Sequence, residues 1–156
     1  SLRFSGAERT RPAAKAVAAL RSPGLAAVVV CPSNPYLSID PILAIPGMKE
    51  LLRDCPAPIV AVSPLIGGKA VKGPTAKIMA ELDLTVSAVE IAKHYSEVID
   101  GLVVDVGDRH LADQFDLPVL FTETLMTTLA DRERLAREVI HFAEGLASEK
   151  KRTGRG

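Results

Sequence analysis

Four short apolar runs recur along the chain, at residues 25–30, 59–63, 102–106 and 119–122. They are rich in valine, isoleucine and leucine and are bounded by glycine, proline and polar residues, so each predicts a buried strand. Helical patterns lie between them, and this alternation is typical of βαβ units. The pattern therefore predicts an α/β fold in which a mostly parallel sheet is flanked by helices.

The helical segments are marked by apolar residues three and four positions apart. Ser38 is expected to cap a helix that continues to Leu52, with a bend at Pro46 and Gly47. Other helices are expected over residues 12–20, 74–82, 87–95 and 108–114. The clearest helix is the last, whose apolar face consists of Leu135, Val139, Phe142, Ala143 and Leu146.

Length and composition restrict the class of protein. The 156 residues suffice for one domain with a sizeable core, and the formal net charge of zero gives no electrostatic support for a nucleic-acid partner. No apolar run approaches the roughly 20 residues that span a bilayer, so no membrane partner is expected. Cys31 and Cys55 form no metal-binding or redox motif. We interpret both as reduced and at least partly buried, in a cytoplasmic protein.

The most informative stretch is CPSNPYLSIDPIL at residues 31–43. It follows a predicted strand and leads into a predicted helix, and ligands of open α/β sheets bind at this kind of edge. Ser33, Asn34 and Ser38 offer polar groups there, while the prolines restrict the loop. A plain turn and helix cap is the equally open structural interpretation.

A second such edge is SPLIGGKAVKGP at residues 63–74. Gly67 and Gly68 would let a ligand approach the backbone closely, and Lys69 or Lys72 could neutralise phosphate. The spacing is not that of a Walker loop. Alone, this stretch is interpreted as a surface loop, and the case for a site comes from having two such loops at one edge.

Two further strand ends carry candidate groups. Asp105 could hold Mg²⁺, contact a sugar or meet a reacting hydroxyl, or it could simply cap the helix that follows. Thr122 or Thr124 could contact a ligand at the next edge, although a strand end followed by a helix cap is the preferred interpretation there. No histidine pair has metal-ligand spacing, and no nucleophile elbow is present.

Together these stretches resemble the 2-phospho-L-lactate transferase (CofD-like) family. The resemblance is carried by residues 31–43 and 62–74, by DGLVVD at 100–105 and by TLM at 124–126. It covers residues 1–147 and corresponds to the C-terminal half of such an enzyme, a partial domain, followed by a basic flexible tail at 148–156. The family has Asp before Thr-Leu-Met, whereas Glu123 stands here.

The resemblance implies a Rossmann-like fold and a Mg²⁺-dependent transferase of coenzyme F-420 biosynthesis. Such enzymes move a phospholactyl or phosphoenolpyruvyl group from a GDP-linked donor to the ribityl hydroxyl of a deazaflavin (FO), releasing GMP. Ser33, Asn34 and Ser38 would then bind the diphosphate. The nucleotide would be lined by Gly67, Gly68 and Lys72, and Asp105 would face the acceptor or the metal.

The resemblance also carries expectations about the whole protein. The metal ligands are expected in an N-terminal half that this sequence lacks, so the chain alone is expected to be inactive, and a homodimer is plausible. The alternative is a YvcK-like regulatory protein that binds a nucleotide sugar. That group normally has a Gly-Ser-Leu-Tyr-Thr-Ser version of the first loop, whereas PSNP at residues 32–35 favours the transferase.

Overall fold

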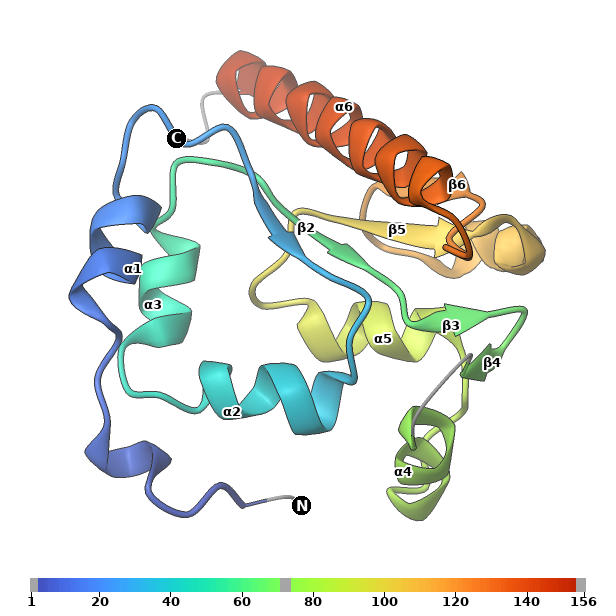
Figure 1. Ribbon diagram of the computed structural model, residues 1–156, viewed down its shortest axis with the longest axis horizontal. Coiled ribbons are helices and arrows are strands. Elements are labelled where there is room, and N and C mark those ends of the chain that lie inside the picture. The colour runs from blue at the N-terminus through green and yellow to red at the C-terminus, as the bar shows by residue number, and fades with distance from the viewer. Residues whose placement is uncertain (1–2, 71–73, 154–156) are drawn as a thin grey trace.

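The computed structural model describes residues 3–70 and 74–153. The described residues form a four-stranded parallel sheet in the order β1 (Val28–Val30), β2 (Ile59–Val62), β5 (Gly101–Asp105), β6 (Val119–Thr122). All four strands were predicted from the apolar runs, and each pairs with the next strand of the sheet. The predicted α/β architecture with a mostly parallel sheet is therefore confirmed (Figure 1).

Helices cover both faces of this sheet (Figure 1). One face is covered by the long helix α6 (Leu129–Thr153). The opposite face carries α5 (Ala88–Tyr95) together with α1 (Ala14–Leu20) and α3 (Met48–Arg53). Sheet residues divide between the two layers by alternation, as the pleat requires.

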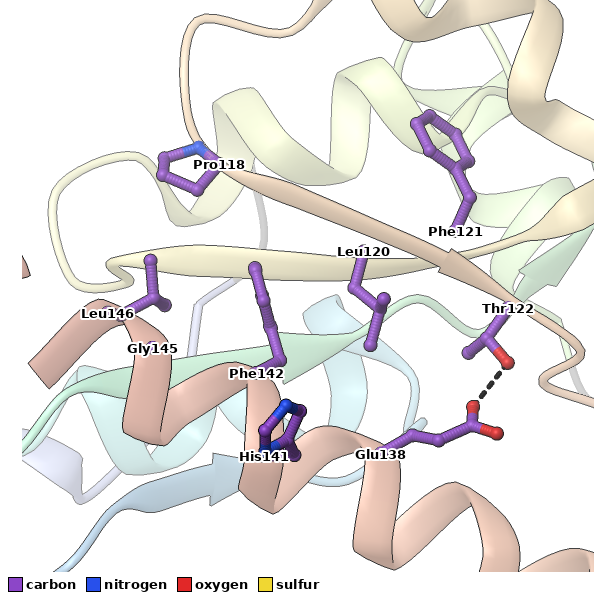
Figure 2. Close-up of a pocket in the computed structure, with 9 residues that line it drawn as sticks. All are labelled: Pro118, Leu120, Phe121, Thr122, Glu138, His141, Phe142, Gly145 and Leu146. Atoms are coloured by element: carbon purple, nitrogen blue, oxygen red, sulfur yellow. Dashed lines mark hydrogen bonds between the residues drawn. The ribbon is translucent and has the colours of Figure 1, made fainter. Parts of the chain in front are cut away.

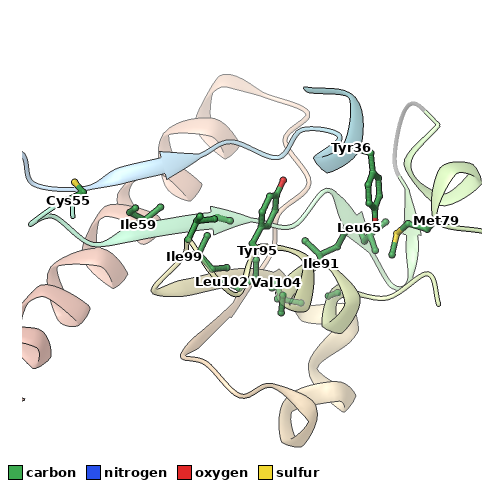
Figure 3. Close-up of a cluster of buried hydrophobic side chains, with 14 of the residues drawn as sticks. Tyr36, Cys55, Ile59, Leu65, Met79, Ile91, Tyr95, Ile99, Leu102 and Val104 are labelled. Atoms are coloured by element: carbon green, nitrogen blue, oxygen red, sulfur yellow. The ribbon is translucent and has the colours of Figure 1, made fainter. Parts of the chain in front are cut away.

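Two apolar clusters follow from that alternation. Ile59 and Ala61 of β2 pack into the larger cluster with α5, whose buried members include Ile91 and Tyr95 (Figure 3). Val60 and Val62 of the same strand face α6. The smaller cluster is completed by Val103, Leu135, Val139, Ala143 and Leu146. The helical face predicted for the last helix is therefore the face that packs on the sheet.

The helix expected from Ser38 to Leu52 is instead three shorter pieces. A π-helical segment η2 (Pro35–Ile39) leads into α2 (Asp40–Leu43), and α3 follows after Gly47. The predicted bend at Pro46 and Gly47 is thus a complete break. The cap is also different, because η2 is capped by Asn34 and Ser38 lies exposed inside the segment.

The segment after β2 contains a hairpin that the apolar pattern did not predict. β3 (Leu65–Ile66) pairs antiparallel with β4 (Lys69–Ala70). Gly67 and Gly68 form the connection, with φ of 55° and 68°. Two consecutive positive φ angles are those of a type I′ turn, which matches the twist of a hairpin. The glycine pair is therefore required by the turn itself.

The remaining helices are close to their predicted positions. They are α4 (Thr75–Glu81) and the 3₁₀ helix η3 (Val106–Gln114), whereas the short 3₁₀ helix η1 (Ala7–Arg9) was not predicted. α6 continues to Thr153, so the predicted tail is helical over its described part. Within the described residues, no helix has the length and apolar character needed to cross a bilayer.

The two cysteines are free thiols in different environments. Cys55 is buried in the larger core cluster, as expected. Cys31 is exposed, so the expectation that it is at least partly buried was wrong. The reason is that β1 ends at Val30 at the edge of the sheet, and Cys31 already belongs to the loop.

Candidate functional site

A cavity of about 270 Å³ lies at the carboxyl ends of the strands. It is formed where the loops after β1, β2 and β6 meet the start of α4. Its lining residues are Pro32, Ser33, Asn34, Ser63, Pro64, Ile66, Thr75, Thr124, Leu125 and Met126. Half of them carry a hydroxyl or amide group, and none carries a charge. This is the edge at which open α/β sheets bind ligands.

Asn34 is held in the cavity wall by its role as a helix cap. Its Oδ1 accepts hydrogen bonds from the backbone N–H groups of Tyr36 and Leu37, each at 3.0 Å. This fixes the amide plane and leaves Nδ2 as the donor that has not been used. Nδ2 is buried and has no hydrogen-bond partner among the described residues. A buried amide without a partner is costly, so this group is prepared to bind an acceptor.

Ser63 is a second oriented donor. It is almost fully buried at the end of β2, and its Oγ accepts the backbone N–H of Leu65 at 3.2 Å. That contact uses an oxygen lone pair and leaves the hydroxyl hydrogen to donate. The hydroxyls of Ser33 and Thr75 make no hydrogen bond to other described residues, so they can turn toward a ligand.

Asp105 lies behind the cavity wall and does not line it. Its Oδ1 accepts the backbone N–H of Gly107 at 2.9 Å, which caps η3. Its Oδ2 accepts both the backbone N–H and the hydroxyl of Thr124, at 3.0 and 3.2 Å. Asp105 therefore holds Thr124 in the wall, and its described contacts are those of a positioning residue.

The other predicted site residues are not brought to this cavity. Ser38 is exposed on η2, and Gly67 and Gly68 form the hairpin turn, which is close enough to η3 that a Cβ at Gly107 would lie 3.6 Å from the Gly67 backbone. Lys72 lies outside the described residues. Of the two threonines that were weighed, Thr124 lines the cavity, whereas Thr122 faces α6.

Thr122 belongs to a separate hollow between β6 and α6, of about 580 Å³ (Figure 2). Its hydroxyl donates to Glu138, and Arg134 donates to both side chains. The rest of the lining is mainly apolar and includes Leu120 and Phe142. This hollow is larger than the cavity at the strand ends, and among its lining residues only Thr122 had been weighed as a candidate.

Two of the five polar residues that line the cavity, Ser63 and Thr75, were not recognised as site candidates. Ser63 stands at the end of β2 as Ser33 stands after β1, and the parallel register places these strand ends side by side. That repeated position was a usable signal. Thr75 comes from α4, and nothing in its local sequence showed that the helix start would reach the cavity.

The residues that are present do not by themselves fit a Mg²⁺ site. Mg²⁺ in proteins prefers carboxylate oxygens together with water and substrate phosphates. The cavity lining offers no carboxylate, and the oxygens of Asp105 accept three hydrogen bonds. Among the described residues no group of three or more His, Cys, Asp or Glu is placed to hold a metal ion.

The fold and the cavity define a class of protein: a Rossmann-like α/β protein whose loops at the strand ends present neutral donors to a ligand. Comparison of the sequence with known protein families identifies the family. The family described as 2-phospho-L-lactate transferase CofD matches residues 1–146. The chain therefore belongs to that family, and the resemblance found in its loops is confirmed.

Several curated proteins are similar to this chain. The 2-phospho-L-lactate transferases of Methanocaldococcus jannaschii and Halobacterium salinarum are 42% and 41% identical over 136 and 134 residues, which cover 87% and 86% of this chain. A phosphoenolpyruvate transferase of Kitasatospora aureofaciens is 33% identical over 143 residues, 89% of the chain. The matches cover 42%, 37% and 44% of these relatives, so the chain spans about two fifths of their length.

Proposed function

We propose that the cavity at the strand ends binds the phosphate groups of a GDP-linked donor in a phospho-acid transferase. The reaction is the one implied by the family. The ribityl hydroxyl of a deazaflavin attacks the phosphorus that carries the acid and loses its proton to solvent, the bond from that phosphorus to the bridging oxygen breaks, and GMP leaves. On this proposal the chain belongs to an enzyme of coenzyme F-420 biosynthesis.

The observation that carries the proposal is the set of hydrogen-bond donors in the cavity wall. Asn34 Nδ2 is buried without a partner, and the Ser63 hydroxyl is oriented by Leu65. Ser33 and Thr75 add hydroxyls from two other elements. Converging neutral donors suit the oxygens of a phosphate, and phosphoryl transfer requires mainly positioning and stabilisation of charge.

Mg²⁺ is part of the proposal, although the described residues supply no complete site for it. A bound Mg²⁺ would neutralise charge on the diphosphate, and it commonly takes much of its coordination from phosphate oxygens and water. The cavity would hold the phosphates, and further ligands would come from the part of the relatives' length that this chain does not span. The names of the relatives include both lactate and enolpyruvate chemistry, so the proposal covers either acid.

The test is isothermal titration of GDP with Mg²⁺ into the 156-residue chain, with a UDP-sugar as comparison. We expect GDP to bind and the UDP-sugar not to bind. Ser63→Ala should weaken GDP binding about tenfold, because it removes a donor to a charged group. Ser96→Ala, at an exposed serine after α5, is the matched control and should bind like the wild type. Preference for the UDP-sugar would contradict the proposal and favour the regulatory alternative.

Transfer itself requires a second assay. The 156-residue chain and a longer polypeptide that contains it, of the relatives' full length, are each mixed with donor, deazaflavin and Mg²⁺. We expect product only from the longer polypeptide, because the cavity lacks carboxylates for a metal. Product from the pure 156-residue chain would show that our view of the metal ligands is wrong.

A further inference from the structure

The hydroxyl of Thr124 differs from the other hydroxyls of the cavity. It lies 3.2 Å from Asp105 Oδ2, which also accepts the Thr124 backbone N–H at 3.0 Å. A carboxylate has only acceptor atoms, so the hydrogen of this bond belongs to Thr124. Thr124 and Asp105 are 5% and 6% exposed, so water competes little for the contact. The Thr124 oxygen is left with lone pairs for the cavity.

The cavity therefore contains groups of two opposite kinds. Asn34 Nδ2 and the Ser63 hydroxyl are held as donors by their bonds to the backbone. Thr124 Oγ1 is held as an acceptor by Asp105. A bare phosphate would satisfy the donors, but its oxygens would meet the lone pairs of Thr124. A ligand that satisfies all three must bring a hydrogen as well as anionic oxygens.

We propose that Thr124 selects a phosphate ester with a nearby free hydroxyl, a polyol phosphate, and accepts the hydrogen of that hydroxyl. Asp105 acts through Thr124 as a positioning residue. The cavity, of about 270 Å³, is slightly smaller than most ligand pockets and suits a phosphate with a few adjoining hydroxyls. The inference rests on the proposed function, because it concerns the same cavity. It adds that a hydroxyl group of the ligand is recognised as well as its phosphate.

Two sources could supply the hydroxyl in the proposed reaction: the ribose of the nucleotide or the ribityl chain of the acceptor. Matched probes separate them. Glycerol 3-phosphate and n-propyl phosphate share a phosphate and a three-carbon chain and differ only in hydroxyls. GDP and its 2′,3′-dideoxy form differ only at the ribose, and riboflavin and lumiflavin differ in the ribityl chain. Dissociation constants are measured by NMR titration of the 156-residue chain.

Wild type should bind glycerol 3-phosphate about five- to tenfold more tightly than n-propyl phosphate, the size expected of one hydrogen bond. Thr124→Val keeps the side-chain shape and the backbone bond to Asp105, and it should abolish this preference without weakening n-propyl phosphate. Thr124→Ser should retain the preference. Ser63→Ala is the control and should weaken both phosphates by the same factor.

The outcomes separate this inference from the proposed function. A preference that persists in Thr124→Val, or that is absent from wild type, overturns the inference even if GDP binds. A preference for glycerol 3-phosphate that Thr124→Val abolishes supports the inference. If the preference for GDP over its dideoxy form is also lost, the hydroxyl comes from the ribose; if the preference for riboflavin over lumiflavin is lost, it comes from the ribityl chain. If the preference is abolished but GDP does not bind, the role of Thr124 stands and the GDP-linked donor is wrong.

Discussion

Asp105 and Thr124 join the ends of two neighbouring strands through one carboxylate oxygen that accepts two hydrogen bonds. Oδ2 accepts the Thr124 backbone N–H and hydroxyl, while Oδ1 accepts the N–H of Gly107. The carboxylate thus connects the end of β5, the start of η3 and the loop after β6. Thr124 lines the cavity, so the shape of the site depends on a residue that does not line it.

The first prediction concerns stability. Asp105→Ala removes the acceptor for three hydrogen bonds and leaves buried donors without a partner, so the free energy of unfolding should fall by about 3 kcal/mol. Urea denaturation followed by circular dichroism measures it. Asp113→Ala, at an exposed position of η3, is the control and should change stability by less than about 0.5 kcal/mol. A loss below about 1 kcal/mol for Asp105→Ala would show that the carboxylate is not needed to hold these elements.

The second prediction separates the two roles of Asn34. Asn34→Ala removes both the cap and the Nδ2 donor, so it should cost about 1 kcal/mol of stability and weaken GDP binding. Asn34→Asp keeps an oxygen that can cap η2 but replaces the donor by a carboxylate. It should retain wild-type stability in thermal melts and still weaken GDP at least about tenfold, because the carboxylate repels phosphate. If Asn34→Asp bound GDP as tightly as the wild type, the Asn34 amide would not be part of the binding site.

The strands could be predicted because a two-residue alternation or a short apolar run has few other interpretations. The residues at which helices start were harder to predict. Asn34 and Ser38 are both good capping residues, and the deciding feature is Pro35, which suits the first position of a helix. The Gly67–Gly68 hairpin was missed because each of its strands has only two residues, too few for a pattern.

The site was predictable in the loop that follows β1. Ser33 and Asn34 belong to that loop, between two prolines, and they line the cavity. Thr75 reaches it from the start of α4, which depends on how that helix packs and cannot be deduced from the local sequence. The role of Asp105 also required the fold, because its partner Thr124 is 19 residues away.

The third prediction compares two glycines, one in the strand β5 beneath α6 and one within α6, at which an added methyl group should have opposite effects on stability. A Cβ at Gly101 would lie 2.8 Å from Leu146 Cδ1 and from the Phe142 ring, so β5 and α6 approach closely because this residue has no side chain. Gly101→Ala should lower the unfolding free energy by about 1–3 kcal/mol through overpacking. Gly145→Ala is the counterpart within α6, where a Cβ would meet nothing within 4 Å. It should raise stability by about 0.5–1 kcal/mol through helix propensity. Equal effects in urea denaturation would contradict the packing described for α6.

The last prediction is a pH dependence at the start of α6. Asp131 accepts the backbone N–H and hydroxyl of Thr127 and the N–H of Thr128, and these bonds lower the pKa of its carboxyl below the usual value. A carboxyl whose pKa is lower in the folded state stabilises the fold above its unfolded pKa, about 4, and loses that contribution as the pH falls further.

Asp131→Asn can cap the helix but does not titrate. The stability advantage of wild type over Asp131→Asn in urea denaturation should therefore be constant from pH 5 to 7, values chosen to lie above that pKa. It should shrink between about pH 4 and 2, as the carboxylate takes up a proton. A difference that stays constant through the acid range would show that the ionised carboxylate contributes nothing beyond the cap.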